Sequence, residues 1–114
     1  MSLTSLKKAG SVRSQVSAGE WQKRIDLAAA YRLVAHYGMD EMVANHISTR
    51  VPGEEGAFLI NPYGMLYEHM HASCFVKVDL EGNILYNPTE YGINRAGFVI
   101  HSAVHRAKHE IDCV

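Results

Sequence analysis

Three histidines near the C-terminus, His101, His105 and His109, are spaced four residues apart. On a helix, residues i and i+4 project from the same side, so the three side chains would form one stripe. Two helical histidines at this spacing can bind one zinc ion, but a catalytic site also needs a third ligand and a free position. No glutamate lies between His101 and His105, so the zinc-protease helix motif is absent. The alternative is a set of boundary histidines on an ordinary helix, with His101 hydrogen-bonded in the core and His109 near the helix end.

A second group, His69 and His71, has a His-x-His spacing. Such a pair can chelate a metal on a strand, because residues i and i+2 share one face. The surrounding residues, YEHMHASCF, are more typical of a loop or a short helical turn, in which the two side chains diverge. We therefore predict no metal ligand in either group of histidines.

The composition is that of one soluble globular domain, or part of one, with 114 residues, 47% apolar and 20% charged. A net charge of −1 without a basic run argues against a nucleic-acid partner. The sequence holds no apolar run of the ~18 residues that span a membrane and no secretion signal, so we expect a cytoplasmic protein without a membrane partner. Cys74 and Cys113 have no metal or redox spacing; we expect two reduced, buried thiols, although a disulfide between them stays open.

The N-terminal half is expected to hold one long helix. Residues 1–16 lack periodicity and are predicted to form a flexible arm, with residues 17–114 belonging to a single domain. A capping box of Ser17 and Glu20 begins the helix, and Gly38 ends it. Its apolar side is predicted to carry Leu27, Tyr31 and Val34, with Ile25, Ala28 and Ala29 beside them.

The rest of the chain is expected to form a sheet and a second helix. The segments HISTRV and AFLIN have strand character, and CFVKVD and NILY flank the turn LEGN as a hairpin. Residues 94–108 have helical periodicity. The predicted apolar stripe of this helix is Gly97, Ile100, Val104, Ala107 and Ile111. The order helix, antiparallel strands, helix predicts an α/β protein with helices packed on a sheet.

Taken together, three segments resemble the class II aldolase/adducin family. They are YRLVAHYGMDEMVANHISTRVPG, FLINPYGMLYEHMHASCFVKVDLEGNIL and INRAGFVIHSAVHRAKHEIDCV, and the resemblance covers residues 21–114. It implies a three-layer α/β/α sandwich with a mainly antiparallel central sheet. It also implies a homotetramer with active sites between subunits and membership among sugar-phosphate aldolases, epimerases and related lyases.

Enzymes of this family use a divalent metal, usually zinc, held by three histidines. Two of these form a His-x-His pair on the strand that follows the helix predicted at residues 94–108. In this sequence that strand would begin at residues 112–114, so the expected ligands would fall beyond Val114. The resemblance thus implies the N-terminal part of a domain, apparently truncated, with an open sheet edge. It implies zinc or another divalent metal in the full-length protein, no metal in this chain, and no activity for this chain alone.

The family's functional positions, carried over residue by residue, show departures. The substrate-binding positions fall on His46, Ser48, Asn61, Tyr63, Gly64 and Arg95. A usual Gly-Asn reads Asn45-His46, a usual Thr-Gly reads Tyr63-Gly64, and a usual Ser-Ser reads Arg95-Ala96. The small hydroxyls that would bind a phosphate are therefore missing, and Arg95 is instead able to hold a carboxylate. The acid–base glutamate position holds Gly97, which cannot transfer a proton.

Two hypotheses of function follow from this pattern. In the first, the full-length protein is a divalent-metal-dependent lyase, an aldolase or related carbon–carbon lyase, acting on a small hydroxy-carbonyl or sugar-derived substrate. In the second, it is a non-catalytic, adducin-like domain for oligomerisation and protein binding, as the glycine at position 97 suggests. A third interpretation, an independent metal-free fragment, is disfavoured because an open sheet edge and the apolar IDCV tail invite aggregation.

Overall fold

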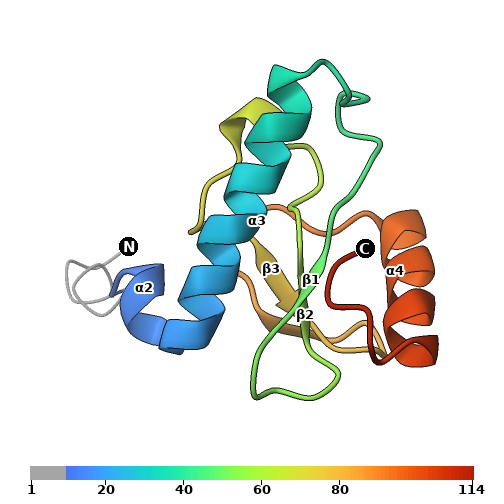
Figure 1. The fold of residues 1–114 in the computed structure, drawn as a ribbon. Helices are drawn as coiled ribbons and strands as arrows, with labels where there is room; N and C mark the ends of the chain where they lie inside the picture. The colour runs from blue at the N-terminus through green and yellow to red at the C-terminus, as the bar shows by residue number, and fades with distance from the viewer. Residues whose placement is uncertain (1–9) are drawn as a thin grey trace.

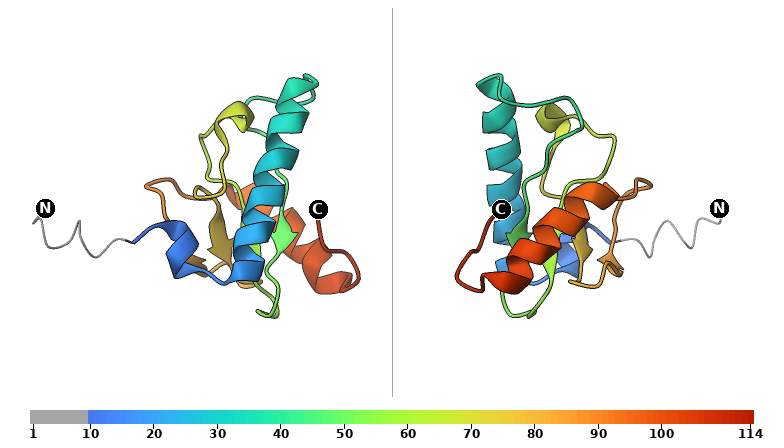
Figure 2. Two further views of the ribbon diagram at one scale, coloured as in Figure 1. Left: turned by 60° about the vertical axis from the view of Figure 1, so that its left-hand side comes forward. Right: turned by 90° about the vertical axis from the view of Figure 1, so that its right-hand side faces the viewer.

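The computed structural model describes residues 10–114. In chain order the elements are α2 (Val12–Gln15), α3 (Ala18–His36), β1 (Thr49–Arg50), β2 (Phe58–Ile60), the 3-10 helix η1 (Tyr67–His69), β3 (Val76–Val78), β4 (Ile84–Tyr86) and α4 (Arg95–Ala107). The strands form an antiparallel sheet in the order β1-β2-β3-β4. Helix α3 lies on one face of this sheet and α4 on the other (Figures 1 and 2), which confirms the three-layer arrangement.

The predicted flexible arm over residues 1–16 falls partly on residues 1–9, which lie outside the described residues. Within the remainder, Val12–Gln15 forms the short helix α2. None of the helices described between residues 10 and 114 is long and apolar enough to cross a membrane.

Helix α3 has the termini that its sequence predicts. The Ser17 hydroxyl accepts a hydrogen bond from the Glu20 backbone N–H at 3.0 Å, as a capping box requires. The chain leaves the helix at Gly38, whose φ of +67° is a conformation that glycine adopts without strain. The predicted buried face is correct for Leu27, Ala28 and Tyr31 but wrong for Ile25, which is 41% exposed.

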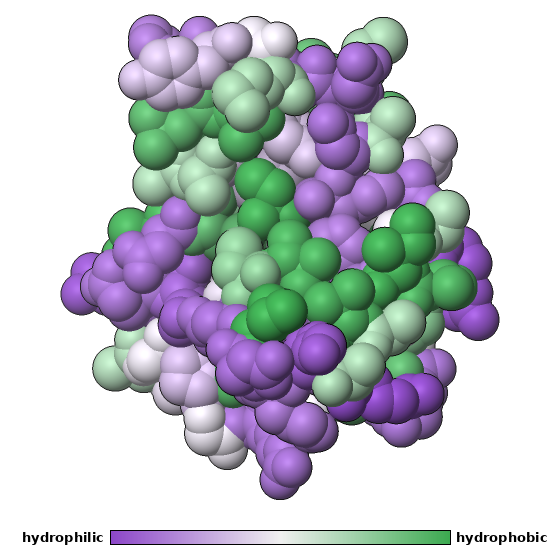
Figure 3. Space-filling model, turned by 45° about the vertical axis from the view of Figure 1, so that its right-hand side comes forward, coloured by the Kyte–Doolittle hydropathy of each residue, from purple (hydrophilic) through white to green (hydrophobic). Residues whose placement is uncertain are grey.

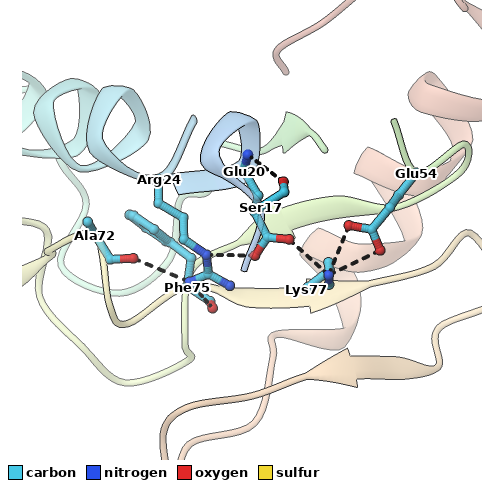
Figure 4. A network of polar contacts seen from close by, with 7 residues as sticks. All are labelled: Ser17, Glu20, Arg24, Glu54, Ala72, Phe75 and Lys77. Carbon is cyan, nitrogen blue, oxygen red and sulfur yellow. Dashed lines mark hydrogen bonds and ion pairs between the residues drawn. The ribbon is translucent and has the colours of Figure 1, made fainter. Parts of the chain in front are cut away.

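Glu20 and Arg24 are fully buried and contact each other (Figure 4), whereas Ile25 and Ala29, which were expected beside the apolar side of the helix, are exposed. Arg24 Nε donates to Glu20 Oε2 at 2.8 Å, and Lys77 Nζ donates to Glu20 Oε1 at 2.8 Å and to the Glu54 carboxylate. Arg24 Nη1 also donates to the backbone carbonyl oxygens of Ala72 and Phe75. This buried ionic network, defined by Glu20, Arg24 and Lys77, joins α3 to β3.

The sheet separates two apolar clusters, because successive strand residues face opposite sides. The cluster beneath α3 contains Leu27, Ala28, Tyr31, Val51, Ala57, Leu59, Tyr67, Met70, Cys74 and Phe75. The cluster beneath α4 is smaller and contains Phe58, Ile60, Val76, Val78 and Phe98. The His105 ring, 4.8 Å from the Phe58 ring centroid, extends this second cluster with a polar side chain.

Helix α4 matches its predicted range. The Asn94 side chain caps it by accepting from the Ala96 and Gly97 N–H groups. The predicted apolar stripe is correct for Gly97, which is buried, but wrong for Ile100, which is 62% exposed, and for Ala107, which is also exposed. The buried positions are Gly97, Phe98, His101, Ser102 and His105. Figure 3 shows apolar residues at the surface on the side of the molecule that carries α4.

The hairpin is confirmed, whereas residues 112–114, where a further strand was expected to begin, pair with the start of β1 only through an isolated bridge. Strands β3 and β4 pair as predicted. After α4 the chain returns to β1, where Ser48 and Val114 exchange backbone hydrogen bonds of 2.8 and 3.0 Å, and Thr49 pairs with Cys113. Both cysteines are free; Cys74 is buried as expected, but Cys113 is exposed, which corrects the prediction of two buried thiols.

Candidate functional site

One serine hydroxyl joins two histidines of α4 to the start of β1. Ser48 is fully buried, and its Oγ lies 2.6 Å from His101 Nδ1 and 2.8 Å from His105 Nε2. The two histidines are one helical turn apart, so a single hydroxyl reaches both. His101 is therefore hydrogen-bonded in the core, as the boundary interpretation of the stripe expected, while His109 is exposed beyond the helix end.

The hydrogen-bond inventory indicates how protons are placed in this cluster. A hydroxyl carries one hydrogen, so Ser48 donates to one imidazole and accepts from the other. His105 Nδ1 is buried without a partner. A buried unpaired N–H is rarer than an unpaired acceptor, so we assign the hydrogen of His105 to Nε2, which donates to Ser48. Ser48 then donates to Nδ1 of His101.

The buried histidines are held in the neutral form. The pKa of His105 is lowered to about 4, chiefly by burial and then by the charge of Arg50 and the proximity of His101, against an opposing effect of Asp112. Burial also lowers the pKa of His101, with a smaller contribution from His46. At neutral pH both rings can accept a proton.

His46 packs face-on against the first turn of α4 at Gly97. A Cβ built on Gly97 would lie 2.8 Å from three atoms of the His46 ring, including Cγ, so no other residue type fits without movement of the ring. The His46 and His101 rings meet edge to face, with centroids 5.9 Å apart. Burial lowers the pKa of His46, and its Nε2 is buried without a hydrogen-bond partner. The position expected to hold an acid–base glutamate is thus covered by an imidazole.

This contact predicts a stability cost for Gly97→Ala. We expect a loss of about 1–3 kcal/mol from overpacking, offset in part by the ~1 kcal/mol that alanine gains over glycine in a helix. Urea unfolding measures the difference. In a His46→Ala background the same substitution is expected to be neutral or stabilising, because the clashing ring is gone. A cost that persists undiminished in that background would show that His46 is not its cause.

Asn61 follows β2 and is buried in the core. Its Oδ1 lies 2.9 Å from the Tyr31 hydroxyl, which also contacts both backbone groups of Ile47, the carbonyl oxygen at 2.6 Å and the N–H at 2.8 Å. Burial raises the pKa of Tyr31 well above its usual value, so the hydroxyl keeps its proton. Tyr31 thereby fixes the residue that follows His46.

The other predicted site residues lie at the surface. Tyr63 is 49% exposed and donates its N–H to Gly92, while Gly64 has a φ of +105°. The Arg95 guanidinium lies 5.5 Å above the Phe98 ring and close to the turn between β3 and β4. The structure therefore gathers His46 and Ser48 in one cluster but does not place Arg95 in it.

Three residues of this site were not among the predicted site residues. His101 and His105 were visible only as part of the stripe of three histidines, and Tyr31 only as an apolar helix residue. Their spacing along the chain was the available signal, but their partners lie 53, 57 and 16 residues away. Contacts of that separation leave no periodic pattern in a sequence.

The described residues do not form a metal centre by themselves. Between residues 10 and 114, no three or more His, Cys, Asp or Glu side chains are arranged to hold a metal ion. His69 lies on η1, with His71 two residues beyond its end, and both are exposed, so the expected helical turn is confirmed. The buried imidazoles of His101 and His105 face Ser48 instead.

A family model described as Class II Aldolase and Adducin N-terminal domain matches residues 25–114. The chain belongs to this family. The match begins inside α3 and includes every strand and α4, so it contains all of the cluster around Ser48.

The relatives in this family include proteins named as aldolases and proteins named as adducins. A Caulobacter vibrioides protein named "Putative aldolase class 2 protein" is 58% identical over 100 residues, which are 88% of this chain and 38% of that protein. Alpha-adducin of Mus musculus is 45% identical over 97 residues, covering 84% of this chain and 13% of that protein. The chain therefore spans less than half the length of these relatives.

Solved structures share the fold. An aldolase II superfamily protein from Pseudomonas syringae has a TM-score of 0.89 and 50% identity, over 91% of this chain and 42% of that one. The L-fuculose 1-phosphate aldolase from Glaciozyma antarctica PI12 has a TM-score of 0.78 and 33% identity, over 99% of this chain and 46% of that one. The described sandwich is thus the arrangement seen in class II aldolase relatives.

Proposed function

We propose that the protein expressed from its complete gene is a carbon–carbon lyase of the class II aldolase type. Its substrate would be a small hydroxy-carbonyl or sugar-derived molecule. The observation that carries the proposal is the histidine cluster of His46, His101 and His105, in which the His46 ring lies on Gly97, the position where the family resemblance places the acid–base group. The fold shared with an L-fuculose 1-phosphate aldolase at 33% identity supports it.

The proposal includes a divalent metal, with zinc expected, and assembly as a cytoplasmic homotetramer. Because residues 10–114 gather no metal-binding group, the proposal places the ligands outside this chain. The residues of this chain would bind and orient the substrate. In that role the side chains of Tyr63 and Arg95 remain predicted contacts, Arg95 for a substrate carboxylate.

The test is a paired measurement on the protein from its complete gene. Metal content is determined by mass spectrometry, and aldehyde release is followed with a panel of sugar phosphates, hydroxy ketones and hydroxy acids. We expect about one divalent ion per subunit and cleavage that stops on chelation and returns with zinc. A folded protein with neither bound metal nor cleavage of any panel member would contradict the proposal.

A second candidate is supported by the adducin relative, which is 45% identical over the shared region. In this alternative the domain is not catalytic and acts through oligomerisation and protein binding. The glycine at position 97 and the missing hydroxyls favour it. The same measurement distinguishes the two, because this candidate predicts a stable oligomer without metal-dependent cleavage.

A further inference from the structure

The His46 imidazole occupies the space that a side chain at position 97 would need. The built Cβ of Gly97 is 2.8 Å from Cγ, Cδ2 and Cε1 of the His46 ring. A contact with three ring atoms at one distance means that the flat face of the ring covers the bare Cα. A ring at residue 46 and a side chain at residue 97 therefore exclude each other in this fold.

Two neighbouring groups hold the His46 ring in place. On one side His101 meets it edge to face, and the orientation of His101 is itself set by the 2.6 Å contact with Ser48. On the backbone side, the Tyr31 hydroxyl binds both the N–H and the carbonyl oxygen of Ile47, the next residue. Groups held by such supporting contacts have the fixed geometry that catalysis and binding require.

The Nε2 atom of His46 is buried and has no hydrogen-bond partner among residues 10–114. A buried polar atom left without a hydrogen bond costs about 1–3 kcal/mol, and such atoms in native proteins call for an explanation, a catalytic role among them. His46 as a whole is only half-buried although its Nε2 atom is buried, whereas His105 is fully buried. Burial lowers the pKa of His46, so the basic form predominates at neutral pH.

We propose that His46, in the loop that precedes β1, is the catalytic acid–base residue of this protein. It supplies the proton transfer that Gly97 cannot perform. The inference rests on the proposed lyase function. With a hydroxy ketone bound, the imidazole takes the proton from the carbon beside the carbonyl. The C–H bond breaks, its electron pair moves to the carbonyl oxygen to give an enediolate, and the neutral ring becomes an imidazolium. Return of the proton to carbon regenerates both partners.

Proton exchange tests this step separately from bond cleavage. The probe is dihydroxyacetone in D2O, incubated with the protein from its complete gene, and deuterium uptake at carbon is followed by NMR. We expect His46→Gln to lower the exchange rate by about 100-fold or more, the usual contribution of an acid–base group, with metal content unchanged. His69→Gln, which removes an exposed histidine on η1, is the matched control and should exchange at the wild-type rate.

A paired swap separates a catalytic from a structural role. In His46→Ala/Gly97→Glu the removed ring leaves space for a carboxylate, and we expect exchange to return to within about tenfold of the wild type. Gly97→Glu alone should not exchange faster than the wild type, because the ring blocks the new side chain. If His46→Gln does not fold, the exchange rates of His46→Asn and of His46→Ala/Gly97→Glu decide whether His46 has a catalytic or a structural role. Exchange at the wild-type rate in a folded His46 variant would overturn this inference alone, whereas a wild type that neither exchanges nor cleaves overturns the proposed function with it.

Discussion

Glu20→Gln is expected to lower the free energy of unfolding by about 3–5 kcal/mol, the usual cost of removing one partner of a buried ion pair. The Glu20 and Arg24 side chains are both fully buried and lie 2.8 Å apart. The substitution keeps the shape of the side chain but removes its charge. The guanidinium of Arg24 would then stay in the core without a counterion. The amide keeps one acceptor oxygen for two cations, so either Arg24 or Lys77 would face its NH2 donor.

Chemical denaturation of the purified variant measures this loss, and Glu54→Gln is its matched control. Glu54 binds the same Lys77 ammonium at 3.0 Å, but its side chain is 44% exposed. Exposed ion pairs contribute about 0–1 kcal/mol, so the control should remain close to the wild type. Equal, small losses of unfolding free energy in Glu20→Gln and Glu54→Gln would show that water reaches the network and that burial does not strengthen its ion pairs.

The stability of the protein is expected to fall by up to about 3 kcal/mol as the pH decreases from about 6.5 to about 4. Burial lowers the pKa of His105 from 6.5 in the unfolded chain to about 4 in the folded one. Between these values the unfolded state binds more protons, so acid favours unfolding. A proton added to His105 would fall on Nδ1, which is buried and has no hydrogen-bond partner among residues 10–114, and it would add a charge near Arg50.

Urea unfolding at a series of pH values tests this linkage. His109→Gln removes an exposed histidine of the same stripe and should leave the slope of stability against pH unchanged. His105→Gln should flatten the slope, although His46 and His101 will retain part of it, because burial lowers their pKa values too. An unaltered slope in His105→Gln would assign the acid sensitivity to other groups.

Element boundaries could be predicted because they depend on local chemistry. Ser17 and Asn94 cap their helices through their own side chains within three residues of sequence, and Gly38 supplies a positive φ. The hairpin between β3 and β4 likewise forms between neighbouring segments. Residues that act on their immediate neighbours leave a signal that can be read from the order of amino acids.

The buried face of α4 could not be predicted in this way. Hydropathy favours Ile100 over His101, yet Ile100 is exposed and His101 buried. The deciding factor is the Ser48 hydroxyl, 53 residues earlier, which satisfies the imidazole and removes the cost of burying it. The same reason explains why Glu20 and Arg24, which resemble a surface pair one turn apart, are found in the core.

The candidate site was predicted only in some of its members, and the contact between His46 and Gly97 was not predicted. His46 and Gly97 were each identified as departures from the family pattern, as two separate changes. Only the folded chain shows that the ring of one lies on the Cα of the other. Arg95 was grouped with them by family position, whereas its contacts are with Phe98 and the hairpin turn. A contact such as that between His46 and Gly97 depends on how α4 packs against the sheet.

The Tyr31 hydroxyl sets where the sheet begins. It binds the N–H and the carbonyl oxygen of Ile47, the two groups that a neighbouring strand would otherwise use, while Ser48 is already paired with Val114. A side chain from the helical layer thus acts as a stop for strand pairing. Because strand pairing does not extend past Ile47, His46 lies outside the strand. The direction of its side chain does not have to follow the alternating pattern of a strand, and its ring packs on α4. The residue at which β1 begins therefore determines where the His46 imidazole can lie.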